Sequence, residues 1–246
     1  MKPTILLIHG ALHDQSTWSL VTPKLGAFSY PNATIQLRTS NPSAPNLTPH
    51  DDVVAIHDVM LPLLDEGKEV VIIAHSYGAV PGLMSIEDNS IVEREEKGLN
   101  GGVKSIMFIS SVLISEKGKT CAEAHYDVGS DWANIDVNAG IVTPGPKSRT
   151  AFYNDLSDKE AEERVKKLRP HSLSAFMTPI PYSVNDLKCP HWYLMCEKDE
   201  TVKWASQERM AGTVRSLRIK KLPTGHCPMI SSPDAFVKIV EDVAAS

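Results

Sequence analysis

The chain has 246 residues, of which 42% are hydrophobic and 22% charged, proportions that are ordinary for a globular protein with one buried core. Its formal net charge of −5 argues against nucleic acid or an anionic membrane surface as a partner. No apolar run approaches the ~18 residues that a membrane span needs, and residues 1–3 lead directly into a short apolar run instead of a secretory signal.

Strands and helices are predicted to alternate through the first part of the chain. Short apolar, β-branched runs predict buried strands, and apolar stripes at helical spacing predict the helices between them. Thr48, followed by Asp51 and Asp52, has the pattern of a helix cap with carboxylates in the first turn. The expected elements are a strand at 4–8, a helix at 16–27, a strand at 33–37, a helix from 48 to about 67, and strands at 69–74 and 104–109.

The strand at 69–74 turns within a few residues into a small-residue segment that can begin a helix, and Ser76 lies on that turn. A serine so placed is forced outward at the carboxyl edge of a parallel sheet, which is the geometry of a nucleophile elbow. The usual pattern is Gly-x-Ser-x-Gly. Here Ala74 takes the first position, where a small side chain is needed because helix and strand cross closely, and Gly78 keeps the second. We therefore predict Ser76 as a catalytic nucleophile.

The alternation stops between residues 112 and 187, a stretch with five prolines, several aromatic residues and one clear helical pattern near 158–168. We interpret residues 112–187 as a lid inserted into a core formed by residues 1–111 and 188–246; the alternative is a long irregular connection. The alternation then resumes, with a strand at 191–196, a helix at 204–212, a strand at 217–222 and a helix at 233–244. The sequence thus predicts an α/β fold with a six-stranded, mainly parallel sheet flanked by helices.

Two polar residues follow the last two predicted strands. His226 comes directly after the last strand, and Asp199 comes after the preceding one. Both therefore share the sheet edge with Ser76, in the chain order that nucleophile-elbow enzymes use. Hydrolysis of an ester by serine needs a base to take the hydroxyl proton and a carboxylate to orient that base. We predict His226 as the base and Asp199 as the acid; Glu197 is the rival acid and could equally be a surface carboxylate.

The developing oxyanion needs backbone N–H donors. Tyr77, the residue after the nucleophile, presents one at the start of the elbow helix. Ala11 is expected to supply the other, because the preceding Gly10 lets the backbone approach the substrate closely.

These motifs resemble those of the α/β-hydrolases, in the branch that includes plant methylesterases, hydroxynitrile lyases and small fungal and bacterial esterases. The resemblance covers nearly the whole chain, through the motifs at 6–11, 74–78, 197–199 and 225–229, and the lid segment at 152–156 is similar to that of fungal-type members. It implies the α/β-hydrolase fold, the triad Ser76, Asp199 and His226, and an oxyanion hole at Ala11 and Tyr77.

Two positions separate hydrolysis from cyanohydrin cleavage within that branch. The lyases carry a bulkier polar residue where this chain has Gly10, and a lysine directly after the catalytic histidine. Here Cys227 follows His226, so no ammonium group is available to hold cyanide. Both positions favour a hydrolase.

Aromatic residues in the lid indicate an apolar pocket. The candidate substrate-binding residues are Gly10, His13, Trp132, Phe152, Phe176 and Met229. The sequence leaves open whether His13 lines the pocket or lies at the surface, and whether the lid aromatics contact substrate or pack the lid. His75 is expected to be structural, with its side chain directed away from Ser76.

Neither a phosphate-binding glycine motif nor metal-ligand spacing is present, including around His125, Asp127 and Asp131, so we expect no cofactor and no metal. The four cysteines lack Cys-x-x-Cys spacing, which favours reduced thiols in a cytoplasmic protein. The expected protein is a serine hydrolase for small apolar carboxylic esters or lactones, a monomer or homodimer. The alternatives are a lyase or cyclase that uses the same pocket, and a non-catalytic ligand receptor.

Overall fold

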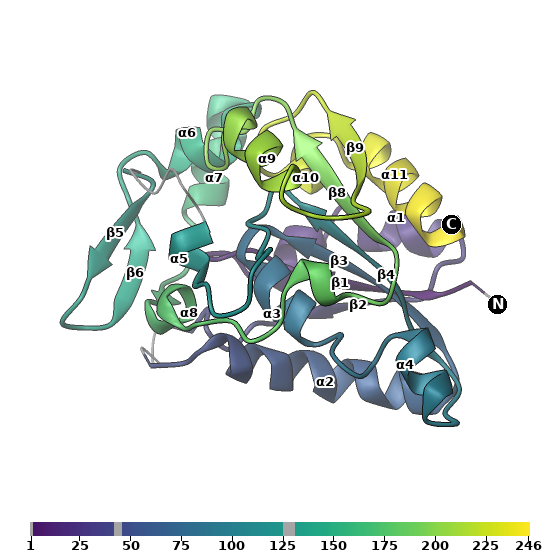
Figure 1. Ribbon diagram of the computed structural model, residues 1–246. Coiled ribbons are helices and arrows are strands. Elements are labelled where there is room, and N and C mark those ends of the chain that lie inside the picture. Colours follow the sequence, from purple (N-terminus) through teal and green to yellow (C-terminus); the bar gives the residue numbers. More distant parts are fainter. Residues whose placement is uncertain (1, 42–45, 125–130) are drawn as a thin grey trace.

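The computed structural model describes residues 2–41, 46–124 and 131–246. Its main sheet has six strands, all paired in parallel, in the order β2-β1-β3-β4-β8-β9 (Figure 1). These strands are β1 (Thr4–Ile8), β2 (Asn32–Ile35), β3 (Glu69–His75), β4 (Gly102–Ile109), β8 (His191–Cys196) and β9 (Arg218–Leu222). The six-stranded α/β fold predicted from the sequence is confirmed.

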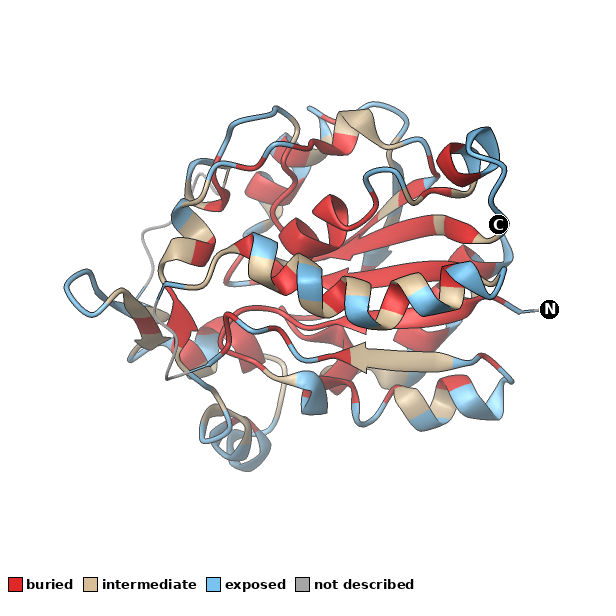
Figure 2. Ribbon diagram, turned by 90° about the horizontal axis from the view of Figure 1, so that it is seen from below, coloured by how far each residue is buried: buried red, intermediate tan, exposed pale blue. Residues whose placement is uncertain are grey.

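Helices cover both faces of this sheet, and the central strands are buried as a result (Figure 2). They are α1 (Thr22–Ala27), α2 (Pro49–Asp65), α3 (Ala79–Met84), α4 (Ile91–Glu96), α9 (Trp204–Ala211), α10 (Pro228–Ser231) and α11 (Pro233–Ala245). Alternate residues of β1 face opposite sides: Leu6 and Ile8 pack with α2 and α3, whereas Ile5 and Leu7 pack with α1 and α11. Continuous apolar runs were the right signal for these strands because both faces are buried.

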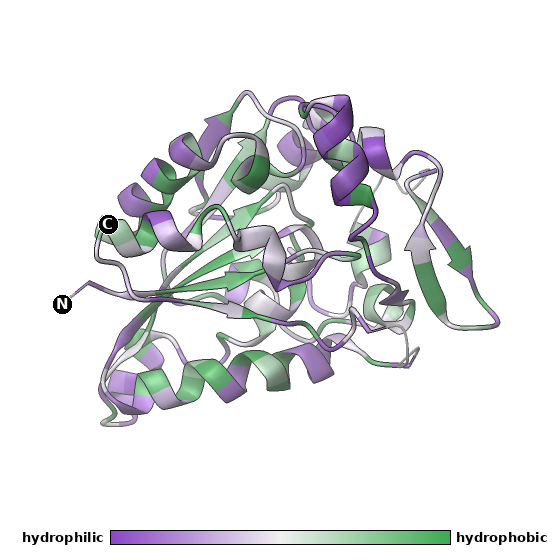
Figure 3. Cartoon of the chain, turned by 180° about the vertical axis from the view of Figure 1, so that it is seen from behind, coloured by the Kyte–Doolittle hydropathy of each residue, from purple (hydrophilic) through white to green (hydrophobic). Residues whose placement is uncertain are grey.

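Helix α2 begins where the sequence predicts, with Thr48 as its N-cap. The Asp51 carboxylate accepts a hydrogen bond from the Thr48 backbone N–H at 2.8 Å, which satisfies a donor that the helix leaves unpaired. The alternating hydrophilic and hydrophobic stripes of α2 are plain in Figure 3, and its apolar stripe faces the sheet.

Two predicted elements differ from the structure. The helix expected at 16–27 is a 3₁₀ turn, η1 (Gln15–Trp18), followed by the separate helix α1. Pro23 explains the break, because proline fits the first turn of a new helix but has no N–H with which to continue an earlier one. Strand β2 ends at Ile35 instead of residue 37, because the Leu37 backbone N–H donates to the His9 ring and not to a neighbouring strand.

Residues 112–187, here called the inserted segment, connect β4 to β8 although these strands are neighbours in the sheet. The segment carries a second, three-stranded antiparallel sheet that the sequence analysis did not predict. Its elements are α5 (Cys121–Ala124), β5 (Ala133–Asp136), β6 (Ile141–Pro144), α6 (Ser148–Tyr153), α7 (Asp158–Val165), β7 (His171–Ser172), α8 (Ser174–Met177) and η3 (Val184–Asp186). The β5–β6 hairpin projects from one end of the molecule, and both termini lie at the other end (Figure 1).

Within the described ranges, none of the helices is both long and apolar enough to cross a membrane. The four cysteines are all buried and unpaired.

Candidate active site

Ser76 directly follows β3 and is the first residue of the 3₁₀ turn η2 (Ser76–Gly78), which leads into α3. Its φ angle is 51°, in the left-handed region that residues with a side chain rarely adopt. Close packing below the turn explains the small residues around it. A Cβ on Gly82 would lie 3.3 Å from the Ala74 Cβ, and a Cβ on Gly78 would collide with the His9 carbonyl oxygen. The strand and helix therefore cross closely, as the sequence pattern predicts for a nucleophile elbow.

The loops after β8 and β9 bring Asp199 and His226 together. The His226 Nδ1 and the Asp199 Oδ2 are 2.9 Å apart, and both side chains are almost completely buried. The other carboxylate oxygen, Oδ1, accepts hydrogen bonds from the Thr201 and Val202 backbone N–H groups at 2.7 and 2.9 Å. Both oxygens of Asp199 are therefore held in place, and the His226 ring is fixed by a carboxylate on Nδ1. The rival Glu197 is exposed to solvent.

The Nε2 atom of His226 is buried and has no hydrogen-bond partner among the described residues. Because Nδ1 carries the proton that Asp199 accepts, Nε2 presents a lone pair that can take a proton from a nucleophile. The ring is held beside the elbow, since its centroid lies 4.7 Å from that of His75, and the His75 Nε2–H donates to the His226 carbonyl oxygen at 2.9 Å. His75 is buried, and this contact gives it a structural role of the kind expected from the sequence.

The loop that carries the predicted second oxyanion donor is fixed by His9. A backbone N–H, that of Leu37, donates to the His9 Nε2 at 3.1 Å, so the His9 Nδ1–H must be the donor to the Gly10 carbonyl oxygen 2.8 Å away. Burial lowers the pKa of His9 to about 4, which keeps the ring neutral near pH 7. The trans peptide between Gly10 and Ala11 is thereby oriented through its carbonyl, and its N–H points the opposite way.

Gly10 is in close contact with the elbow: a Cβ there would lie 2.9 Å from the Ser76 Cβ. A side chain at this position would therefore push against the predicted nucleophile. Ala11, Ser76 and Tyr77 all line one cavity, so the two predicted oxyanion donors and the nucleophile open onto the same space.

His13 is buried, so of the two possibilities the surface position is wrong. Its Nδ1–H donates to the Ala11 carbonyl oxygen at 2.7 Å, and its Nε2 accepts from the Tyr153 hydroxyl at 2.9 Å. Burial lowers the pKa of His13 to about 3. The ring lies behind Phe152, with centroids 5.3 Å apart, and so contacts the loop of Ala11 and not the cavity.

The side chain of Tyr77 is positioned by a hydrogen bond to the buried carboxylate of Asp52. Its hydroxyl donates to the Asp52 Oδ2 at 2.8 Å, and the Thr39 backbone N–H donates to the Asp52 Oδ1 at 3.0 Å. Burial raises the pKa of Asp52 to about 6 even though these hydrogen bonds oppose the shift. The ring of Tyr77 thus has a fixed position at the cavity wall.

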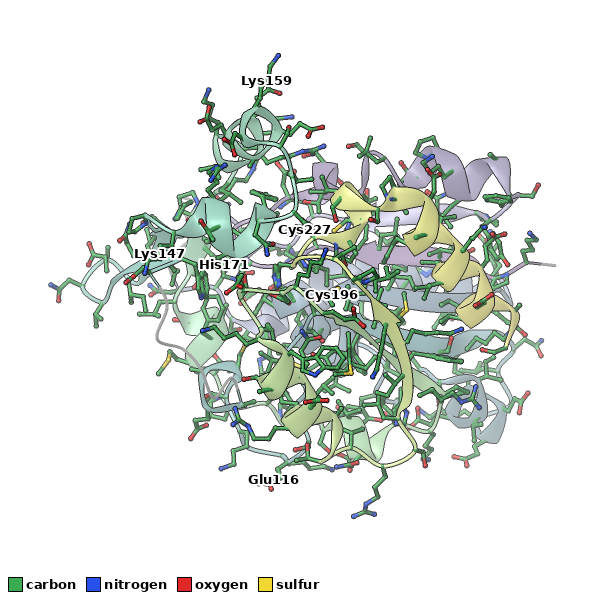
Figure 4. All side chains as sticks on the ribbon, turned by 90° about the horizontal axis from the view of Figure 1, so that it is seen from above. Glu116, Lys147, Lys159, His171, Cys196 and Cys227 are labelled. Atoms are coloured by element: carbon green, nitrogen blue, oxygen red, sulfur yellow. The ribbon has the colours of Figure 1, made fainter. Side chains whose placement is uncertain are left out.

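The cavity has a volume of about 520 Å³ and is mostly apolar. Its walls are formed by Ala11, Ser76, Tyr77, Val112, Cys121, Ala122, Asp131, Trp132, Ala133, Asn134, Ile135, Val142, Pro146, Phe152, Leu173, Phe176, Met177 and Val202. Among these, Asp131 is the one with a charged side chain, and it pairs with Lys147 at 2.6 Å. Figure 4 shows Lys147 near the base of the β5–β6 hairpin and, farther along the molecule, Cys196 at the end of β8 and Cys227 directly before α10.

Three of the predicted substrate-binding residues lie in this wall, namely Trp132, Phe152 and Phe176. Gly10, His13 and Met229 lie outside it in this structure, and their contact with substrate stays a prediction. Sequence reasoning missed the wall residues of α5, β5 and β6. These short elements carry no strong periodic signal, and their approach to Ser76 depends on how the inserted segment folds back.

No group of three or more histidine, cysteine, aspartate or glutamate residues within the described ranges is arranged to hold a metal ion. His125 and Asp127, which the sequence analysis considered, lie outside those ranges. Asp131 is engaged with Lys147.

The parallel sheet, the elbow serine and the buried Asp–His pair beside an apolar cavity together have the architecture of an α/β-hydrolase. The profile of the alpha/beta hydrolase family matches residues 5–239, and the chain belongs to that family. It is similar to the alpha/beta hydrolase nvfD of Aspergillus novofumigatus, at 23% identity over 99% of this chain and 97% of that protein. It is also similar to the probable hydrolase R7 of a Phoma species, at 26% identity over 99% of this chain and 98% of that protein.

Solved structures with the same fold include enzymes of the branch that the sequence resembles. Polyneuridine aldehyde esterase aligns with a TM-score of 0.81 at 16% identity, covering 99% of this chain and 100% of that chain. Methylketone synthase I of tomato aligns with a TM-score of 0.79 at 14% identity, covering 100% and 98%. A pyrethroid hydrolase of Sphingobium faniae has a TM-score of 0.76 at 20% identity, covering 99% and 98%. At these identities the likeness confirms the fold of that branch.

Proposed function

We propose that the protein is a serine hydrolase that cleaves small, uncharged carboxylic esters or lactones through an acyl-enzyme on Ser76. The observation that carries the proposal is the buried Asp199–His226 pair, whose ring packs on His75, the neighbour of Ser76 at the strained elbow, and whose Nε2 has no hydrogen-bond partner among the described residues. The similar proteins include an esterase and a pyrethroid hydrolase, and this chemistry agrees with theirs.

The proposed reaction starts when the Ser76 hydroxyl attacks the substrate carbonyl carbon and its proton passes to the His226 Nε2. The backbone N–H groups of Ala11 and Tyr77 stabilise the negative charge on the former carbonyl oxygen. The intermediate collapses, and the proton returns from His226 to the leaving alcohol oxygen. Water then attacks the acyl-enzyme by the same route, which releases the acid and restores Ser76. Asp199 keeps His226 in the required tautomer.

The cavity supports the substrate class. A volume of about 520 Å³ is within the usual range for a small-molecule site. Its walls are mostly apolar, and the one carboxylate that the described residues contribute to them is ion-paired. Cys227 supports hydrolysis over cyanohydrin cleavage. Its thiol follows His226, is buried, and has a pKa that burial raises well above the usual range, so it is neutral and cannot attract cyanide.

Substitution of the proposed nucleophile tests the reaction. We expect Ser76→Ala to lower kcat for p-nitrophenyl butyrate at least about a thousandfold, because the acyl-enzyme cannot form. The melting temperature of the variant, measured in parallel, should not fall, since the left-handed turn is retained and only a hydroxyl is removed. Turnover near the wild-type rate in S76A would refute the assignment. Cyanohydrins and lactones assayed beside the ester would separate a lyase from a hydrolase.

A further inference from the structure

We propose that residues 151–155, here called the α6 end segment, form a clamp that positions the loops of Asp199 and His226. The proposal rests on the proposed function and adds two positioning residues to it, Asp155 and Thr201. The α6 end segment belongs to the inserted segment, yet it contacts both loops through hydrogen bonds over sequence separations of 50 and 70 residues.

The contact with the base loop runs through Asp155. Its Oδ2 accepts a hydrogen bond from the Gly225 backbone N–H at 2.6 Å, directly before His226. A hydrogen bond to an ionised acceptor is about twice as strong as a neutral one. In addition, the Phe152 ring packs on the His226 ring, with centroids 5.6 Å apart. The α6 end segment therefore contacts both the backbone directly before the proposed base and the ring of that base.

The contact with the acid loop runs through Thr201. Its hydroxyl donates to the Ala151 carbonyl oxygen at 2.8 Å, while its backbone N–H donates to the Asp199 Oδ1 at 2.7 Å. One buried residue thus connects the α6 end segment to the carboxylate that orients His226. The Asn154 Nδ2–H also donates to the Lys198 carbonyl oxygen at 2.8 Å, but this bond is exposed to water and contributes less.

The α6 end segment packs closely against Gly225 in the loop that carries His226. A Cβ at this position would overlap the Asn154 Oδ1 and lie 2.9 Å from the Asp155 Oδ1. Gly225 does not have a positive φ, so a side chain here would be resisted by the Asn154 and Asp155 side chains, which it would have to displace, and not by backbone conformation.

The side chain of Asp155 also has an unfavourable effect on the stability of the fold. Its Oδ1 is buried and has no hydrogen-bond partner among the described residues. A buried carboxylate oxygen without a partner destabilises the fold, and an apolar side chain of similar size would avoid that penalty. A carboxylate at this position is therefore better explained by the bond that it makes to the base loop than by packing.

Neither Asp155 nor Thr201 lines the cavity, so their loss should alter alignment and not substrate contact. Displacement of a catalytic group by about 1 Å can cost about a hundredfold in rate. We therefore expect Asp155→Ala and Thr201→Val each to lower kcat by about 10–100-fold, with KM for p-nitrophenyl butyrate changed by less than about threefold.

Conservative variants serve as the matched controls. Asp155→Asn keeps an oxygen that can accept from the Gly225 N–H, and Thr201→Ser keeps the hydroxyl, so both should retain kcat within about threefold of wild type. Asp158→Ala removes an exposed carboxylate near Asp155 that pairs with Arg149, and kcat should not change. Losses that D155N and T201S fail to recover, or kcat values for D155A and T201V within about twofold of wild type, would overturn the clamp.

Hydrogen exchange provides a second readout that does not depend on turnover. We expect D155A to speed amide exchange in residues 223–228 and T201V to speed it in residues 197–202, while D158A leaves both unchanged. Unaltered exchange in these loops would contradict the proposal. If the wild type hydrolysed none of the esters, the proposed function would fail, but the exchange data would still decide whether the clamp exists. If D155A does not fold, the T201V and T201S pair carries the test.

Discussion

Several histidines at the site are neutral structural groups, and their tautomers follow from backbone partners. His9 accepts from one backbone N–H and donates to the Gly10 carbonyl, and His13 connects the Ala11 carbonyl to a tyrosine hydroxyl. Burial lowers the pKa of His9 to about 4 and that of His13 to about 3, so neither changes charge near pH 7. These two rings fix the loop that carries the proposed oxyanion donor, and they leave proton transfer to His226.

Asp52 has a measurable effect on how stability varies with pH. Its pKa is raised by burial to about 6 in the folded protein, against 3.8 as the ordinary value. A raised pKa means that the stabilising contribution of the protonated form is complete below about pH 4 and is lost as the pH rises through about 6. The loss corresponds to about 2–3 kcal/mol for a shift of this size.

Asp52→Asn removes this titration while keeping the shape of the side chain. We expect the unfolding free energy of wild type minus that of D52N to fall by about 2–3 kcal/mol between pH 4 and pH 7, as measured by urea denaturation at several pH values. A difference that stays constant over this range would mean that the carboxylate does not titrate as the burial requires.

Among single residues of the candidate site, those that follow strands could be predicted from the sequence. Ser76, Asp199 and His226 could be selected because each comes directly after a predicted strand, and strand ends are shared by the fold. Asp155 and Thr201 could not be selected in this way, because their roles depend on contacts between loops about 50 and 70 residues apart. No local pattern reports such a contact.

Two glycines illustrate how differently the elements depend on close packing. Gly78 lies at the elbow, where a Cβ would collide with the His9 carbonyl oxygen. Gly26 lies exposed in α1, and a Cβ there would have no neighbouring atom within 4 Å. We expect Gly78→Ala to lower the melting temperature by about 3–10 °C, because overpacking costs about 1–3 kcal/mol.

Gly26→Ala is the matched control and should leave the melting temperature unchanged or raise it by up to about 3 °C, since alanine favours helix by about 1 kcal/mol. Differential scanning calorimetry of both variants makes the comparison. Equal melting temperatures for G78A and G26A would show that the elbow tolerates a wider crossing than the distances imply.

The four central strands β1, β3, β4 and β8 were predictable because each is mostly buried and reads as a nearly unbroken apolar run. The edge strands β2 and β9 are more exposed and carry a weaker signal. The elements of the inserted segment were harder. Strand β5 is largely exposed and β6 is partly buried, but each has only four residues, and β7 has two. Neither alternation nor a long apolar run therefore marks them. The helix α7 was predicted near its observed place because its charged face and Ser157 cap are local signals.

For the whole molecule, the apolar cavity predicts selection by charge. p-Nitrophenyl butyrate and mono-p-nitrophenyl succinate have acyl chains of four carbons, but the second ends in a carboxylate. The cavity walls offer that carboxylate no cationic side chain among the described residues, and the one charged wall residue, Asp131, is already paired with Lys147. We expect kcat/KM for the succinate to be at least about 100-fold lower, because the charge must lose water without gaining a partner.

The methyl ester of the same succinate has a similar length without the charge, and it should be hydrolysed at a rate closer to that of the butyrate. Steady-state assays of the three substrates at one pH make the comparison. Equal kcat/KM for the charged and methylated succinates would show that the acyl chain does not enter the apolar cavity.

Because β4 and β8 are neighbours in the sheet, mutations that change the ligand and mutations that change the rate of turnover should fall at different sites. These strands pair with each other directly, so the sheet does not rely on the β5–β6 hairpin that supplies part of the cavity wall. The hairpin can therefore change in sequence during evolution, and the ligands of the cavity with it. The condition is that the α6 end segment keeps its contacts with the loops of Asp199 and His226. Selectivity then changes with the β5–β6 hairpin, while turnover depends on the α6 end segment.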